Sequence, residues 1–302
     1  MGDELPRQFQ DDLTQVSRMT ALALGEVVVG HPRSVLAHLP HLCCQASGRS
    51  WSDVRSIQGA WAQLYDASRL IDQVQDEDGL DLASRSRVLN SSVALFFRSA
   101  EAIGQLRPEI QSGLFAQIRQ VVTGQWEDSI NTHPTIEEAI RIAELKTGAF
   151  LGLGCWLGAM AAGAEQVTCE SFKDFGRSLG VLLQIHDDLE WLEGLGSAQK
   201  YGQERFSNVI LAHAWQAMTT DERLKLESSL ISLQSTNDPE AAQRIREDLI
   251  RRGGRYVSAL MGVRYRAIAL VALSRTQAPE SEALQVLKEL TETLVKSFQR
   301  PS

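Results

Sequence analysis

Residues 180–191 read GVLLQIHDDLEW, an apolar segment that runs into acidic residues. Its apolar residues recur with the period of a helix that buries most of its surface. Gln184 and Glu190 each lie about one helical turn from Asp187, so the three side chains share a face. Apolar segments that lead into carboxylates are costly unless the charges meet a partner or a metal ion. The stretch therefore predicts a core helix with a functional acidic end.

The same period extends along the chain on both sides of this stretch. Short clusters of glycine, proline, serine and asparagine interrupt it, and period-two alternation of β-branched residues is almost absent. We therefore predict an all-α fold without a sheet of consequence. The predicted helices cover residues 8–28, 33–47, 51–78, 84–104, 108–130, 135–164, 168–194, 205–217, 220–234, 238–273 and 279–299.

The interruptions are too short for flexible linkers, and no internal repeat is present. We expect a single all-helical domain over residues 1–302, with residues 1–30 as a peripheral N-terminal helix. The uncharged stretch 147–164 is nearly long enough to span a bilayer. Because Lys146 and Glu165 bound it closely, we interpret it as the core helix of a soluble protein.

Charge and cysteine usage narrow the classes of function. The formal net charge of −8 argues against a general binder of nucleic acid or of anionic membranes. The four cysteines form no CxxC and no paired spacing, which indicates reduced, buried thiols. The acidic N-terminal segment lacks the apolar core of a secretory signal, so we expect a cytoplasmic protein.

A second acidic cluster, DQVQDED at residues 72–78, ends the predicted helix 51–78. Asp72 and Asp76 are four residues apart, so their carboxylates are close enough to share a cation. Negative charge at a helix C-terminus opposes the helix dipole, so something positive should compensate it. A simple surface pair between Asp72 and Arg69 remains an alternative.

Two all-oxygen acidic clusters favour Mg²⁺ over Zn²⁺ as the bound ion. No second histidine lies at metal-binding spacing from His186, so we interpret His186 as an ordinary helix residue. Magnesium usually combines a few carboxylates with substrate phosphates, and a diphosphate would also need cations from the protein. The candidates are Lys146 with its neighbour Thr147, and Lys200 and Arg205 in a polar loop.

In this order the motifs resemble those of the trans-isoprenyl diphosphate synthases, the polyprenyl synthetase family of the class I isoprenoid synthase superfamily. Residues 72–76 resemble the first DDxxD motif with its second aspartate replaced, and residues 180–188 resemble the helix that leads into the second. Lys146-Thr147 is similar to the Lys-Thr pair of the family, and residues 200–207 are similar to its basic loop. The resemblance covers roughly residues 30–300.

The resemblance implies a helical bundle of the isoprenoid synthase type, with acidic motifs facing each other across the mouth of a central cavity. It also implies an enzyme that ionises an allylic prenyl diphosphate with the help of Mg²⁺. The implied metal ligands are Asp72 and Asp76 on one side and Asp187 and Asp188 on the other. The implied diphosphate-binding residues are Lys146, Thr147, Gln184, Lys200 and Arg205.

The departures from the family pattern concern the second substrate, isopentenyl diphosphate. The family grips it with a Gly-Lys-Arg segment and an adjacent Arg-Arg pair, whereas only Arg33, Arg85 and Arg87 remain here as substitutes. We therefore favour a terpene synthase, or a prenyltransferase with another acceptor, over a chain-elongating synthase with a rearranged isopentenyl diphosphate site. A non-catalytic partner subunit is the third alternative. The acidic run 72–78 also has a weak likeness to bacterial enzymes that prenylate a tryptophan in a pheromone peptide.

Small residues below Asp72 bear on substrate size. Ala67 and Ser68 lie about one helical turn below Asp72, and Trp61 lies three turns below it. A prenyl tail that enters beside Asp72 would therefore have a length on the order of 15 Å available before it meets Trp61. This spacing favours farnesyl or geranylgeranyl diphosphate as the substrate. Alternatively, Ala67 and Ser68 are small only because they pack against another helix. We expect a homodimer formed through residues 101–126.

Overall fold

The computed structural model describes residues 35–49, 51–75, 81–106, 110–131, 133–195, 207–236 and 238–298. These residues form helices and turns without any strand, which confirms the predicted all-α fold. The predicted helix 8–28 lies outside the described residues. The elements are α3 (Leu39–Ala46), α4 (Trp51–Gln75), α5 (Leu82–Leu106), α6 (Gln111–Ile130), α7 (Ile136–Ala143), the π-helical turn η2 (Glu144–Gly148), α8 (Ala149–Ala161), α9 (Gln166–Gly194), α10 (Val209–Gln216), α11 (Thr220–Thr236), α12 (Pro239–Arg251), α13 (Gly254–Arg275) and α14 (Glu282–Ser297).

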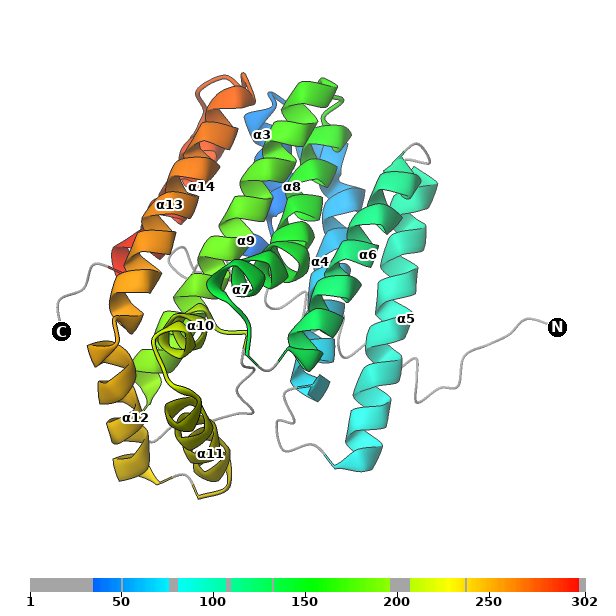
Figure 1. Cartoon of the computed structure of the whole chain (residues 1–302). Coiled ribbons are helices and arrows are strands. Elements are labelled where there is room, and N and C mark those ends of the chain that lie inside the picture. Colours follow the sequence, from blue (N-terminus) through cyan, green and yellow to red (C-terminus); the bar gives the residue numbers. More distant parts are fainter. Residues whose placement is uncertain are drawn as a thin grey trace.

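The bundle is organised around α9. Figure 1 shows α8 and α9 in the middle, α5 at one edge, and α13 with α14 at the opposite edge. Helix α9 packs most extensively against α8 and α13. Phe172, Phe175, Leu179 and Leu182 are fully buried and follow one another at three- and four-residue steps along α9. The apolar period of the sequence thus places α9 in the core, as predicted.

The uncharged stretch 147–164 contains α8, most of whose residues are buried. Its glycines allow neighbouring helices to come close. A β-carbon on Gly158 would lie 2.2 Å from the carbonyl oxygen of Pro40, and one on Gly154 would lie 2.6 Å from the ring of Trp61. Close packing against α3 and α4 therefore explains this composition, and the core-helix interpretation is confirmed.

Among the described helices, α13 is long and apolar enough to cross a membrane. Its most apolar window has a mean hydropathy of 1.4 and is 39% buried. A single helix of this kind is weak evidence for membrane insertion, because core helices of soluble proteins have the same composition.

The predicted helix ends differ from the observed ones by a few residues, and two predicted helices differ more substantially. The predicted helix 238–273 is divided at Gly253, whose φ of +94° ends α12 and lets α13 start in a new direction. The predicted helix 135–164 contains η2, a π-helical turn that apolar periodicity does not reveal. The cysteines Cys43, Cys44, Cys155 and Cys169 are buried free thiols, as predicted.

Candidate functional site

The π-helical turn η2 brings Lys146 and Thr147 to the contact between α6 and α9. Such turns widen a helix locally and occur frequently at functional sites. The turn is also held from α13, because the hydroxyl of Tyr265 donates a hydrogen bond to Glu144 at 2.8 Å.

Glycines set how closely the neighbouring helices approach this turn. A β-carbon on Gly124 of α6 would lie 2.5 Å from the backbone nitrogen of Lys146. A β-carbon on Gly180 of α9 would lie 2.6 Å from the Cα atom of Gly148. Only glycine fits at these positions without a shift of backbone, so the two contacts fix the backbone that carries Lys146.

A buried carboxylate orients the side chain of Lys146. The Nζ atom donates to Oδ2 of Asp128 at 2.9 Å, and the hydroxyl of Ser207 donates to the other oxygen. Asp128 has a relative exposure of only 6%. It is not among the predicted site residues, because a carboxylate near the end of a predicted helix looks like a surface charge in the sequence.

A second chain of hydrogen bonds connects η2 with α9 and α10. The hydroxyl of Thr147 donates to Gln184 at 3.3 Å, and the amide nitrogen of Gln184 donates to Oδ1 of Asp188 at 3.3 Å. The backbone N–H of Val209 donates to Oδ2 of Asp188 at 2.8 Å. Three predicted residues, Thr147, Gln184 and Asp188, therefore lie in one network.

Asp188, on α9, accepts a hydrogen bond from the first residue of α10 and so holds the start of that helix in place. It is 5% exposed, and protein donors occupy both of its oxygens. Burial raises its pKa to about 7, although the bonds from Val209 and Gln184 act in the opposite direction. This geometry gives no support to the predicted role of Asp188 as a metal ligand.

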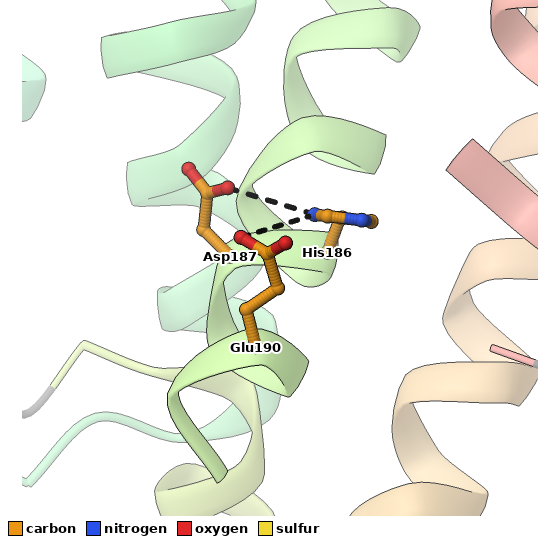
Figure 2. A group of neighbouring side chains, drawn as sticks. All are labelled: His186, Asp187 and Glu190. Carbon is orange, nitrogen blue, oxygen red and sulfur yellow. Dashed lines mark ion pairs between the residues drawn. The ribbon is translucent and has the colours of Figure 1, made fainter. Parts of the chain in front are cut away.

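The neighbouring residues on α9 face solvent and each other. The side chain of Asp187 is 37% exposed, that of Glu190 is 63% exposed and that of His186 is 18% exposed. Figure 2 shows Nδ1 of His186 directed toward both carboxylates, 3.7 Å from Oδ1 of Asp187 and 3.8 Å from Oε2 of Glu190. One ligand atom from each of the three residues lies within 4.8 Å of the others, which is close enough for one ion. His186 is thus part of a cluster that the sequence did not indicate.

Asp72 is half-buried near the end of α4. In Figure 1, α4 and α9 both run toward the lower end of the bundle. Both acidic helix ends are therefore found toward one end of the molecule. Four predicted site residues lie outside the described residues: Arg33, Asp76, Lys200 and Arg205.

The residues below Asp72 on α4 contact other helices. Ala67 is fully buried beside Leu95 of α5, and its carbonyl oxygen accepts a hydrogen bond from Ser92. The hydroxyl of Ser68 donates to the carbonyl oxygen of Tyr65 within α4. For Ala67, these contacts favour the alternative that it is small for packing.

Trp61 is a core residue. It is fully buried, donates through its ring nitrogen to the carbonyl oxygen of Leu36 at 3.3 Å, and stacks on Phe150 with a centroid distance of 4.7 Å. Tyr65, one turn closer to Asp72, lies 6.2 Å from the ring of Phe150 and is half-buried. These three aromatic rings form a cluster between α4 and α8.

Arg85 and Arg87 lie in the first turns of α5. Arg87 is exposed and donates to the hydroxyl of Ser84 at 3.2 Å, whereas Arg85 is half-buried. Side chains two residues apart on a helix are separated by about 200° around its axis. The two arginines therefore do not form the adjacent pair that would grip one diphosphate together.

Comparison with known proteins adds three findings. The profile of the family described as polyprenyl synthetase matches residues 33–249. A short chain isoprenyl diphosphate synthase of Methanocaldococcus jannaschii is 27% identical over 146 residues, which are 44% of each chain. The tryptophan prenyltransferase ComQ of Bacillus spizizenii is 25% identical over 148 residues, 47% of this chain and 52% of that protein. The aligned part thus spans about half the length of these curated relatives.

The fold has counterparts among solved structures. A polyprenyl synthase from Caulobacter crescentus, crystallised with calcium and isoprenyl diphosphate, superposes with a TM-score of 0.74 and 18% identity. The superposition covers 96% of this chain and 94% of that one. At this identity the likeness establishes the bundle architecture.

Proposed function

Because this chain belongs to the polyprenyl synthetase family, we propose that it is an enzyme that ionises an allylic prenyl diphosphate and releases diphosphate. The proposed substrates are farnesyl and geranylgeranyl diphosphate. The observation that carries the proposal is the pair of networks that hold Lys146, Thr147 and Gln184 beside the acidic end of α9. A bundle that served only as a scaffold would not need a lysine fixed to a buried carboxylate there.

Three residues of these networks, Lys146, Asp128 and Gln184, have a role in the proposed reaction. Cleavage of the allylic C–O bond leaves a prenyl cation beside diphosphate, so stabilisation of the leaving group is the main requirement. Lys146 supplies a positive charge that Asp128 holds in place. Gln184 offers amide hydrogens, and the apolar walls of α8 and α9 would keep water from the cation.

The acidic residues suit a hard divalent cation. Asp72 and Asp187 offer partly exposed carboxylate oxygens on two helices that lead to one end of the bundle, and oxygen ligands are those that Mg²⁺ prefers. We propose these two residues as ligands, together with Asp76. A bound Mg²⁺ would neutralise charge on the departing diphosphate. Asp188 is left out of this set because protein donors occupy it.

The positions of Arg85 and Arg87 bear on what happens to the prenyl cation after ionisation, that is, on whether isopentenyl diphosphate is added to it. They lie on different sides of α5, so a tight site for isopentenyl diphosphate has little basis among the described residues. We therefore favour cyclisation, or transfer to another acceptor, over chain elongation. Similarity to a tryptophan prenyltransferase makes an indole side chain an acceptor to be tested.

The test is a set of incubations of the purified chain with Mg²⁺. Geranyl, farnesyl and geranylgeranyl diphosphate are each supplied alone, with isopentenyl diphosphate, or with a tryptophan-containing peptide. Diphosphate release and organic products are followed together. A hydrocarbon or alcohol from one allylic diphosphate alone supports a terpene synthase, and a prenylated peptide supports transfer to indole. Longer diphosphates that form only with isopentenyl diphosphate would establish chain elongation instead.

Variants separate catalysis from a partner-subunit role. Asp72→Asn and Asp187→Asn should abolish turnover, whereas Asp221→Asn, an exposed carboxylate in the first turn of α11, should not. If the chain releases no diphosphate alone but stimulates an added active synthase, and both variants retain that effect, it is a non-catalytic subunit.

A further inference from the structure

The cluster of His186, Asp187 and Glu190 contains a buried polar atom without a hydrogen-bond partner. Nδ1 of His186 has almost no solvent exposure and makes no hydrogen bond. It lies 3.7 Å and 3.8 Å from the nearest oxygens of Asp187 and Glu190 (Figure 2). These separations are too long for hydrogen bonds. A nitrogen buried in this way is costly unless something binds it.

The distances among the ligand atoms of His186, Asp187 and Glu190 suit three ligands of one metal ion. Nitrogen and oxygen ligands lie about 2.0–2.2 Å from a first-row metal ion, so two ligands of the same ion are about 3–4 Å apart. The ligand atoms of this cluster lie within 4.8 Å of one another, so small rotamer adjustments would close the site. Two carboxylates and a neutral imidazole together carry the charge that a divalent cation balances.

The helix holds these ligands in place. His186 and Glu190 are four residues apart and share a face of α9, while Ile185 and Leu189, each the residue directly before one of them, are buried in the core. Among the described residues, Glu190 has no lysine or arginine partner. Glu193, one turn further on, is bound instead by Arg246 and Arg255. Within the described part of the chain, no lysine or arginine side chain neutralises the charge of Glu190.

We infer that His186, Asp187 and Glu190 bind one divalent transition-metal ion of the Mn²⁺, Co²⁺ or Zn²⁺ class. The imidazole nitrogen is the ligand that distinguishes this site from an all-oxygen magnesium site, because Co²⁺ and Zn²⁺ bind imidazole much more strongly than Mg²⁺ does. The inference deepens the proposed function. It rests on that function in one respect, namely that the bound ion would lie beside a diphosphate. Metal binding by the chain itself does not depend on that function.

The experiment measures Co²⁺ binding to the metal-stripped full-length chain without any diphosphate, by calorimetry and by the visible absorption of bound Co²⁺. Mg²⁺ is titrated in parallel. The variants are His186→Gln and Glu190→Gln. The matched control is His133→Gln, because His133 also lies close to a carboxylate, 3.5 Å from Glu227, but outside the three-residue cluster.

We expect the His186→Gln variant to bind Co²⁺ at least roughly tenfold more weakly and to change its absorption spectrum, with Mg²⁺ binding altered less than about twofold. Glu190→Gln should weaken both ions. Glu190 is 63% exposed, so this variant tests the site even if His186→Gln unfolds the chain. Unchanged Co²⁺ binding in either variant, or an equal loss in the His133→Gln control, would overturn the inference.

An equal loss of Co²⁺ and Mg²⁺ binding in the His186→Gln variant would also overturn it, since His186 would then only position the carboxylates. Failure of the proposed function gives a different result. In that case Co²⁺ would bind as expected, while no allylic diphosphate would release diphosphate in the presence of either metal.

Discussion

Lys146 and Asp128 are 18 residues apart in the sequence, yet they form an ion pair of 2.9 Å in which Asp128 is almost completely buried. Nothing in the residue pattern around Asp128 predicts this contact, because it depends on how α6 meets η2. Lys146, Thr147 and Gln184, in contrast, were predictable from their order along the chain. The sequence therefore suggests candidate substrate-binding residues more readily than it suggests the residues that hold them in place.

Asp128→Asn tests whether Asp128 positions Lys146. The amide keeps the size of the side chain but removes the charge that holds the ammonium group, so we expect kcat for diphosphate release to fall roughly 10- to 100-fold. Steady-state kinetics and a melting curve measure the effect. Glu127→Gln is the matched control, because the neighbouring Glu127 pairs with the exposed Arg141. Equal activity of the two variants would contradict the role of Asp128.

Asp188→Asn tests the buried carboxylate at the start of α10. The pKa of Asp188 is about 7 in the folded chain, against an ordinary value of 3.8. The folded state thus holds this proton more tightly, and the stability it contributes is complete below about pH 4 and lost as the pH rises to about 7. The amide has no proton to lose. Relative to the wild type, the variant should gain up to on the order of 4 kcal/mol between pH 4 and pH 8.

Urea denaturation at both pH values, in buffer with a chelator, measures this difference. A difference between variant and wild type that does not change with pH would contradict a raised pKa of the buried Asp188 carboxylate.

Ala67→Phe decides between the two interpretations of the small residues on α4. Because Ala67 is fully buried beside Leu95, a phenyl ring should overpack the contact of α4 with α5 and lower the free energy of unfolding by roughly 1–3 kcal/mol. The chain-length preference for the allylic substrate should stay the same. Thermal unfolding and product analysis give both quantities. Unchanged stability with a shorter accepted chain would instead place Ala67 beside the prenyl tail.

At the scale of helices, periodicity predicted most of the elements, because burial of one face repeats every three or four residues. It missed the π-helical turn η2, since one extra residue in a turn hardly changes the apolar pattern. It also missed the break at Gly253, where a left-handed backbone conformation interrupts an otherwise continuous pattern. Gly253 changes the direction of the helix axis and η2 changes the register of the helix. Neither change alters the spacing of apolar residues in the sequence.

Gly180→Ala tests whether close approach of α9 positions η2. The added methyl group would meet the backbone of Gly148 at 2.6 Å, so η2 or α9 must shift, and we expect a loss of roughly 1–3 kcal/mol in stability together with lower activity. Gly59→Ala is the matched control. Gly59 is exposed within α4 with no atom within 4 Å of an added β-carbon, so alanine there should stabilise the chain by about 0.5–1 kcal/mol. A harmless Gly180→Ala variant would contradict the close contact.

At the scale of the whole molecule, the sequence predicted the fold class, which the structure confirms, and placed the proposed site where two acidic helix ends lie. Two helices with acidic C-terminal ends, together with the family resemblance, sufficed for that. It could not predict which of the adjacent residues Asp187 and Asp188 is buried, since that depends on where α10 begins. The same applies to His186, whose neighbours become evident only when the rotation of α9 is known.

The outer surface of α5 and α6 bears on how the chain assembles. Phe97, Val122 and Trp126 are 64%, 61% and 61% exposed, and Figure 1 shows their two helices side by side at one edge of the bundle. Monomeric proteins rarely leave aromatic and aliphatic side chains of this size exposed on neighbouring helices. Val122 and Trp126 lie in the segment 101–126 expected to form a homodimer, and Phe97 lies just before it. A two-fold interface would bury the same surface on both chains.

Trp126→Glu should therefore convert a dimer into a monomer, because the new charge would lie in the centre of the apolar contact and face its own copy across the two-fold axis. Light scattering coupled to size exclusion measures the mass. Val271→Glu on α13 is the matched control, since Val271 is 53% exposed on the opposite edge of the bundle. If Val271→Glu dissociates the dimer and Trp126→Glu does not, the interface lies on α13, and the apolar surface of α5 and α6 must have another partner.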